Sequence, residues 1–193
     1  MAMDQDLELM LRVRRGDAES FEALLTRHRA PLINYFLRMV HDQALAEDLA
    51  QEVFLRVYRA RERWKPDAKF STWLYRIATN LALNALRDAK GTASRAASED
   101  GNGDDETSRL PDPHPSVVEH LMASEREEII RRAVESLPAN QRAAVVLHKY
   151  QDVDYRQIAK ILGVTESAVK SLLFRAYESL RGRLEPLVKG GEI

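Results

Sequence analysis

The chain has 193 residues, of which 45% are hydrophobic and 31% charged, and its formal net charge is −1. This balance is typical of a globular protein with one large domain or two small ones. The sequence contains no cysteine, which excludes disulfides and thiolate metal sites. It shows no signal-peptide pattern and no apolar run of about eighteen residues, so we expect a cytoplasmic protein without a transmembrane helix.

The first part of the chain has helical periodicity throughout, and no alternating pattern indicates strands. Four helices are expected, each delimited by a capping side chain, a glycine or a loop. The expected spans are 4–15, 17–40 with a kink at Pro31, 42–64, and 71–87, delimited by Gly16, Asp17, Asp42 and Ser71 or Thr72. A loop over 65–70 separates the last two.

The composition changes over residues 88–120, where eight acidic residues stand against three basic ones. A segment of low hydrophobicity and excess charge cannot offset the cost of ordering, so we expect a flexible acidic linker over about 91–119. One interpretation is a plain tether. The other is that the acids imitate a nucleic-acid backbone or occupy a basic channel in a partner.

Helical patterning resumes at about 117, with expected helices over 117–136, 139–150, 154–162 and 165–184. A tight turn at Gly163 and a cap at Thr165 make the last two a candidate helix-turn-helix. The fold class we predict is all-α, with two small helical domains joined by the linker.

The strongest local signal is basic. Residues 55–87 contain eight Lys or Arg and two acids, and both tryptophans of the chain lie in 64–73. Cations bind phosphates and aromatic rings stack on unpaired bases, so the patch indicates nucleic-acid binding. On the helix after residue 70, one face presents Trp73, Arg76, Asn80, Asn84 and Arg87. Amides can recognise base edges, although a merely solvated face is the alternative.

The preceding helix has a different exposed side, which carries Asp48, Gln51, Glu52, Leu55 and Tyr58. Acids beside exposed apolar residues suit docking onto a protein of complementary charge. Glu47, Asp48 and Glu52 lie close together on this helix, and we interpret them as part of a solvated or protein-docking face and not as a metal site.

The last helix presents Ser167, Lys170, Ser171 and Phe174 outward, with Arg175 at the flank. Residues 155–183 hold six basic and two acidic residues, as DNA binding requires. A helical hairpin without DNA binding is the alternative. The sequence has no HExxH motif, glycine-rich phosphate loop or nucleophile elbow, so we expect neither an enzyme nor a cofactor or metal site.

Three blocks together resemble the extracytoplasmic-function (ECF) family of bacterial RNA polymerase sigma factors. AEDLAQEVFLRVYR resembles the family's polymerase-binding segment, and FSTWLYRIATNLALNALR resembles its minus-ten promoter segment. The stretch LPANQRAAVVLHKYQDVDYRQIAKILGVTESAVKSLLFRAYESLR resembles its region four, which recognises the minus-thirty-five element. The resemblance covers about 5–87 and 120–184, and implies region two over 1–90 and region four over 120–187.

The resemblance implies roles for three sets of residues, with core RNA polymerase, promoter DNA and an anti-sigma factor as partners. Polymerase binding falls on Asp48, Leu49, Gln51, Glu52, Phe54, Leu55 and Tyr58, of which Phe54 is expected to support the surface from the core. Minus-ten contacts fall on Lys65, Lys69, Phe70, Ser71, Thr72, Trp73, Arg76, Asn80, Asn84 and Arg87. Minus-thirty-five contacts fall on Arg156, Thr165, Ser167, Lys170, Ser171, Phe174 and Arg175.

Two other functions remain open at this point. A two-domain helix-turn-helix repressor or activator that binds duplex DNA alone would not explain the tryptophans or the acidic docking face. A helical adaptor with no DNA role would not explain the two basic patches. In the sigma-factor interpretation, polymerase holds two small DNA-binding units apart, so that the spacing of promoter elements contributes to specificity.

Overall fold

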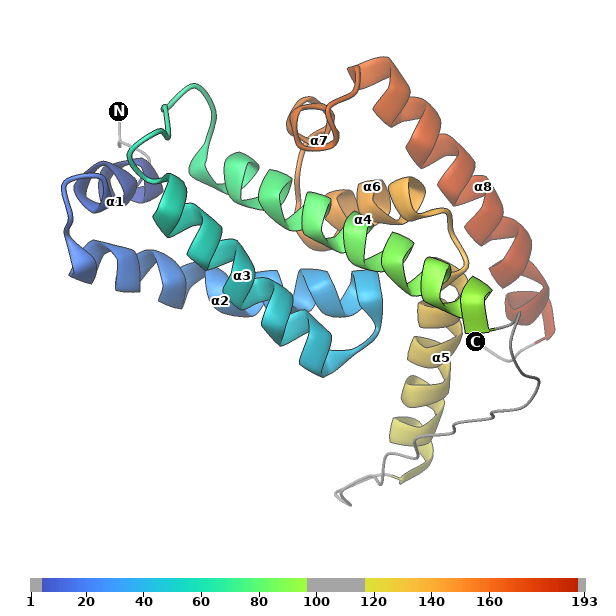
Figure 1. Cartoon of the computed structure of the whole chain (residues 1–193). Coiled ribbons are helices and arrows are strands. Elements are labelled where there is room, and N and C mark those ends of the chain that lie inside the picture. The colour runs from blue at the N-terminus through green and yellow to red at the C-terminus, as the bar shows by residue number, and fades with distance from the viewer. Residues whose placement is uncertain (1–4, 97–116, 191–193) are drawn as a thin grey trace.

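The computed structural model describes residues 5–96 and 117–190, with side chains for 5–91 and 126–185. Within these ranges every regular element is a helix, which confirms the all-α fold class. Residues 97–116, which include most of the expected linker, lie outside the described residues. Figure 1 shows the helices arranged in two groups that pack against each other.

The first group contains α1 (Gln5–Val13), α2 (Ala18–Val40), α3 (Gln43–Ala60) and α4 (Phe70–Ala96). Two aspartates begin helices as expected, because each carboxylate accepts otherwise unpaired backbone N–H groups. Asp17 accepts from Glu19 at 3.1 Å, and Asp42 accepts from Leu45 at 2.9 Å. Helix α2 continues on both sides of Pro31.

Helix α4 differs from the prediction at both ends. It begins at Phe70, so Ser71 and Thr72 lie inside its first turn and are not its caps. It continues to Ala96, well beyond the expected end at 87. The additional residues are mostly good helix formers, and the single Gly91 among them costs only about 1 kcal/mol relative to alanine. Helix α3 ends at Ala60, earlier than the expected 64.

The second group contains α5 (Val117–Glu135), α6 (Ala139–Tyr150), α7 (Tyr155–Leu162) and α8 (Glu166–Gly190). The predicted helix-turn-helix is confirmed in α7 and α8. Gly163 ends α7 with a φ of 67°, a left-handed conformation that costs glycine nothing. The Thr165 hydroxyl accepts the N–H of Ala168 at 3.1 Å and so begins α8.

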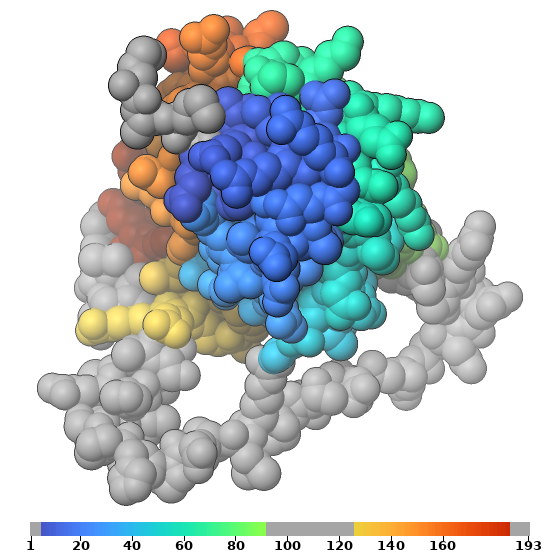
Figure 2. Space-filling view, turned by 90° about the vertical axis from the view of Figure 1, so that its left-hand side faces the viewer, coloured from blue at the N-terminus to red at the C-terminus, as the bar shows by residue number. Residues whose placement is uncertain are grey.

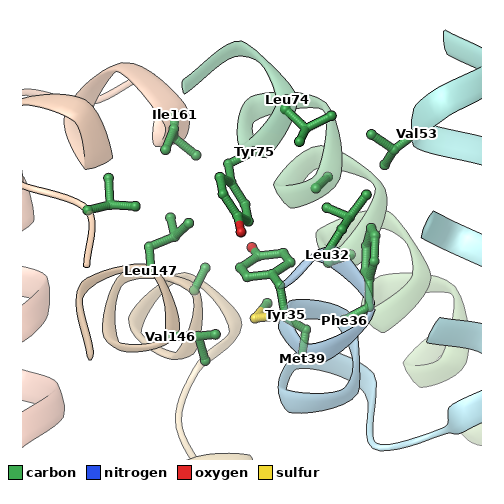
Figure 3. Close-up of a cluster of buried hydrophobic side chains, with 14 of the residues drawn as sticks. Leu32, Tyr35, Phe36, Met39, Val53, Leu74, Tyr75, Val146, Leu147 and Ile161 are labelled. Atoms are coloured by element: carbon green, nitrogen blue, oxygen red, sulfur yellow. The ribbon is translucent and has the colours of Figure 1, made fainter. Parts of the chain in front are cut away.

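The two groups share one hydrophobic core. Helix α4 packs against α6 and α7, and α2 packs against α5 and α6. In Figure 3, Tyr35 and Tyr75 of the first group face Val146, Leu147 and Ile161 of the second. Figure 2 shows the molecule from another side, with the yellow atoms of α5 next to those of α2. The sequence indicated two units but did not indicate that they join.

Candidate nucleic-acid interface

Helix α8 presents its predicted residues on one exposed face. Ser167, Lys170, Ser171, Phe174 and Arg175 line a single shallow hollow. Phe174 is 68% exposed, whereas Val169, Leu173 and Ala176 on the opposite side are buried. Arg156 and Thr165 are also exposed. An apolar ring flanked by two cations suits a major groove, where it can contact a thymine methyl between phosphates.

Helix α4 likewise separates an exposed side from a buried one. Arg76, Asn80, Asn84 and Arg87 are exposed and Trp73 is half-buried. The buried positions of the same helix are Leu74, Ala78, Leu81 and Ala82. Arg87 donates to the side-chain oxygen of Asn84 at 2.8 Å, so these two side chains act as one unit. The predicted face is therefore present and open at Asn80 and Asn84.

The aromatic part of the basic patch is largely structural, which corrects the sequence-based interpretation. Trp64, Phe70 and Tyr75 are buried, with exposed fractions of 5%, 1% and 6%. Trp73 is held against this cluster, its ring centroid 6.2 Å from that of Trp64 and 6.1 Å from that of Phe70. The sequence did indicate that Tyr75 is buried, because Ala78 and Ala82 follow it at the spacing of one helix face.

The loop before α4 and the first turn of α4 likewise combine exposed cations with buried residues. Lys65 and Lys69 are exposed, whereas Thr72 is buried and Ser71 half-buried. Phe70, expected to contact DNA, instead packs against the ring of His28, with centroids 5.3 Å apart. In this arrangement the cations of the loop face solvent, while Phe70 and Thr72 fix the loop to the core.

Helix α3 carries the predicted docking face. Asp48, Gln51, Leu55 and Tyr58 are exposed, and Leu49 and Glu52 are partly so. Phe54 is buried, as expected for a residue that supports this face from below. The Glu52 carboxylate accepts from Arg56 at 2.7 Å, which neutralises part of its charge.

The docking face continues into an apolar groove of about 670 Å³ between α2 and α3. Leu55 and Tyr58 form one wall, and Phe21, Leu25 and Ile33 of α2 form the other. The α2 wall of this groove was not among the residues predicted from the sequence. This wall could have been predicted, because Phe21, Leu25 and Ile33 recur at multiples of four residues and therefore share a helix face.

Among the described residues, no cluster of three histidines or acids is close enough to hold a metal ion. No described helix combines the length and apolarity needed to cross a membrane.

Comparison with known proteins agrees with this geometry. Residues 24–92 match the Sigma-70 region 2 family, and residues 127–180 match Sigma-70, region 4. The chain is 32% identical over 194 residues to the RNA polymerase sigma-H factor of Pseudomonas aeruginosa, with 98% of each chain covered. It is 32% identical over 190 residues to the ECF RNA polymerase sigma-E factor of Escherichia coli, covering 95% of this chain and 96% of that one.

Solved structures share the fold. CnrH in complex with the cytosolic domain of CnrY aligns with a TM-score of 0.68 at 21% identity, covering 95% of this chain and 99% of that one. The sigma factor RpoE in complex with the anti-sigma factor NepR from Bartonella quintana aligns with a TM-score of 0.65 at 20% identity, covering 87% and 98%.

The chain therefore belongs to the ECF family of RNA polymerase sigma factors, the transcription initiation factors that bind core polymerase and direct it to promoters. The matched residues place most of α2, all of α3 and most of α4 in region 2, and the second half of α5, all of α6 and α7 and most of α8 in region 4.

Proposed function

We propose that the three exposed faces divide promoter recognition among them. The α3 face and its groove bind core polymerase, the α4 face with Lys65 and Lys69 binds the separated strand, and the α8 face binds duplex DNA. The observation that supports this assignment is the exposure pattern on α4 and α8. Polar and cationic residues face solvent there, while the intervening residues of the same helices form the core. Residues 1–90 and 120–187 are the corresponding functional units.

The chemistry of each face fits its role. Asn80 can both donate to and accept from a base edge, and the cations neutralise phosphates. Capturing an unpaired base offsets part of the few kcal/mol needed to unstack it. The chain contributes no covalent chemistry, because polymerase makes the RNA. It acts where promoter and polymerase are found, in the cytoplasm.

An anti-sigma factor is the regulatory partner that we propose. The groove between α2 and α3 is apolar and leaves Leu55 and Tyr58 with exposed fractions of 49% and 43%. An amphipathic helix of an inhibitor placed there would cover the polymerase-docking face directly. The inhibitor and polymerase would then compete, which equilibrium binding with purified core polymerase can measure. Simultaneous binding of both would contradict this proposal.

Asn80→Ala tests the assignment of α4. We expect the variant to bind core polymerase normally and to open a duplex promoter at least tenfold less well, because it lacks a hydrogen-bonding contact made only with the separated strand. Permanganate footprinting on a duplex and on a pre-melted template measures this effect. The control is Asn140→Ala, the same change at an exposed position of α6. Wild-type opening of the duplex promoter by Asn80→Ala would refute a role in strand opening.

A further inference from the structure

Helix α1 belongs to the first half of the molecule, α1–α4, but lies outside the residues 24–92 that match region 2. It packs against α2 and α4, and Figure 1 shows it at the end of the molecule where α3 leads into α4. The loop at this end, residues 65–69, carries Lys65 and Lys69, two of the cations that we assign to the separated strand. The contacts of α1 therefore bear on how this loop is held.

One carboxylate of α1 is bound to two consecutive residues of α2. Asp6 accepts from Nε2 of His28 through Oδ2 at 2.8 Å, and from Nη1 of Arg27 through Oδ1 at 2.5 Å. The side chains of Asp6 and His28 are only 14% and 12% exposed, so water competes little for the hydrogen bond between them. Because both carboxylate oxygens are engaged, the carboxylate has a fixed orientation, and it fixes the imidazole of His28 in turn.

The ring of His28 continues this series of contacts into α4. Its centroid lies 5.3 Å from that of Phe70, the first residue of α4, with an angle of 59° between the ring planes. Phe70 is 1% exposed, and its ring centroid lies 6.1 Å from that of Trp73. Asp6 is thus connected, through His28 and Phe70, to the tryptophan at the start of the strand-binding face.

Phe70 is also one of two anchors of the loop. Residues 65–69 include no buried residue, whereas Trp64 before them and Phe70 after them are 5% and 1% exposed. A short exposed segment follows a course set by the residues that fix its ends, so a shift of Phe70 moves Lys69, its direct neighbour in the chain. Such shifts matter for binding, because supporting residues must hold functional groups within about 0.5 Å of their working positions.

We propose that Asp6 and His28 are positioning residues for strand binding. They hold Phe70 in place and, through it, keep Lys69 and Trp73 in the geometry that receives the separated promoter strand. Both act through Phe70 and not by contact with DNA, since their side chains are largely buried. The inference rests on the proposed assignment of Lys69 and α4 to the separated strand, and it makes α1 part of the strand-binding unit.

Alanine substitutions in the assembled holoenzyme test this role. Each variant is combined with core polymerase, and fluorescence anisotropy measures its dissociation constant for a labelled, pre-melted promoter template. Asp6→Ala and His28→Ala should weaken template binding at least fivefold, because the loop loses its fixed geometry, while core polymerase binding stays within twofold of the wild type. Glu8→Ala is the matched control, since Glu8 is an acid of the same helix that pairs with Arg12 at the exposed surface, and it should leave both constants unchanged.

A double-mutant cycle separates positioning from a general loss of stability. If His28 acts through the loop, the effect of His28→Ala on template binding should shrink at least twofold when Lys69→Ala has already removed the cation that it positions. A combined loss equal to the product of the two single effects would show that the residues act independently, and would overturn the proposal.

Two other results would also overturn it. Wild-type template binding by Asp6→Ala and His28→Ala would show that the loop does not depend on them. A parallel loss of core polymerase binding would show that their role is only to stabilise the fold. Failure of the underlying assignment is recognised separately, because Lys69→Ala alone would then bind the pre-melted template as the wild-type protein does.

Discussion

Arg142→Ala is the substitution for which the structure gives the clearest expected cost. The side chain is 8% exposed and donates to two backbone carbonyls at the ends of α2 and α5. Removing it leaves the carbonyl of Met39, a fully buried residue, without this donor. An orphaned buried acceptor costs about 1–3 kcal/mol, and the more accessible carbonyl of Glu135 adds less. We expect the free energy of unfolding to fall by about 2–4 kcal/mol.

Urea denaturation followed by circular dichroism measures this loss. At a typical slope of about 2 kcal/mol per molar urea, the midpoint should move down by about 1–2 M. Arg132→Ala is the matched control, because that side chain is 73% exposed and pairs with Glu128 four residues away. Such exposed pairs contribute only about 0.3–0.5 kcal/mol. Equal midpoints for the two variants would refute the view that Arg142 stabilises the junction of the halves.

Three further predictions concern α8, the helix-turn-helix turn and the end of α2. Lys170→Ala should weaken binding to the upstream promoter element and reduce the salt slope by about 0.9, the value for one phosphate contact, while Lys149→Ala should leave the slope unchanged. Gly163→Ala should lower stability by about 1–2 kcal/mol in thermal unfolding, because its φ is 67°. Gly182→Ala, inside α8 and with open space around it, should instead raise stability by up to about 1 kcal/mol. Burial, more than any neighbouring charge, lowers the pKa of His41 below 6.5. His41 therefore binds a proton more readily in the unfolded chain than in the folded one, so the stability of the wild-type protein should fall as the pH drops below 6.5. His41→Asn removes this titrating group. The variant should therefore lose less stability than the wild type between about pH 7.5 and about pH 5.5. An unchanged slope for Lys170→Ala, a loss of stability for Gly182→Ala, or parallel pH profiles would contradict these expectations.

Much of the fold could be predicted because it depends on local chemistry. Asp17, Asp42 and Thr165 accept backbone N–H groups within the next three residues, and Gly163 adopts a backbone conformation that other residues avoid. Each of these signals depends only on residues that are close together in the sequence, so it can be recognised without the tertiary structure. The exposed faces of α4 and α8 followed from helical periodicity for the same reason.

The junction of the two halves could not be predicted in this way. Tyr75, Leu147 and Ile161 are apolar positions that a separate small domain would also bury, so periodicity does not reveal which helices they face. The sequence around Arg142 does not indicate its role, because its acceptors lie on two other helices. The burial of Phe70 was unexpected for a related reason, since an aromatic residue in a basic stretch can either stack on a base or pack in the core.

The length of α4 limits how far the two halves can move apart. From Ala96 to Val117 the chain makes 21 steps between Cα atoms, and at about 3.3–3.6 Å per residue these span at most about 70–75 Å, whatever their conformation. Measured from Arg87, the limit is about 83–89 Å, against about 99–108 Å had α4 ended there. With DNA rising about 3.4 Å per base pair, the limit of about 70–75 Å from Ala96 corresponds to roughly twenty base pairs. The nine additional helical residues therefore shorten the reach between the two halves by about 16–19 Å, because each rises about 1.5 Å in a helix instead of about 3.3–3.6 Å when extended.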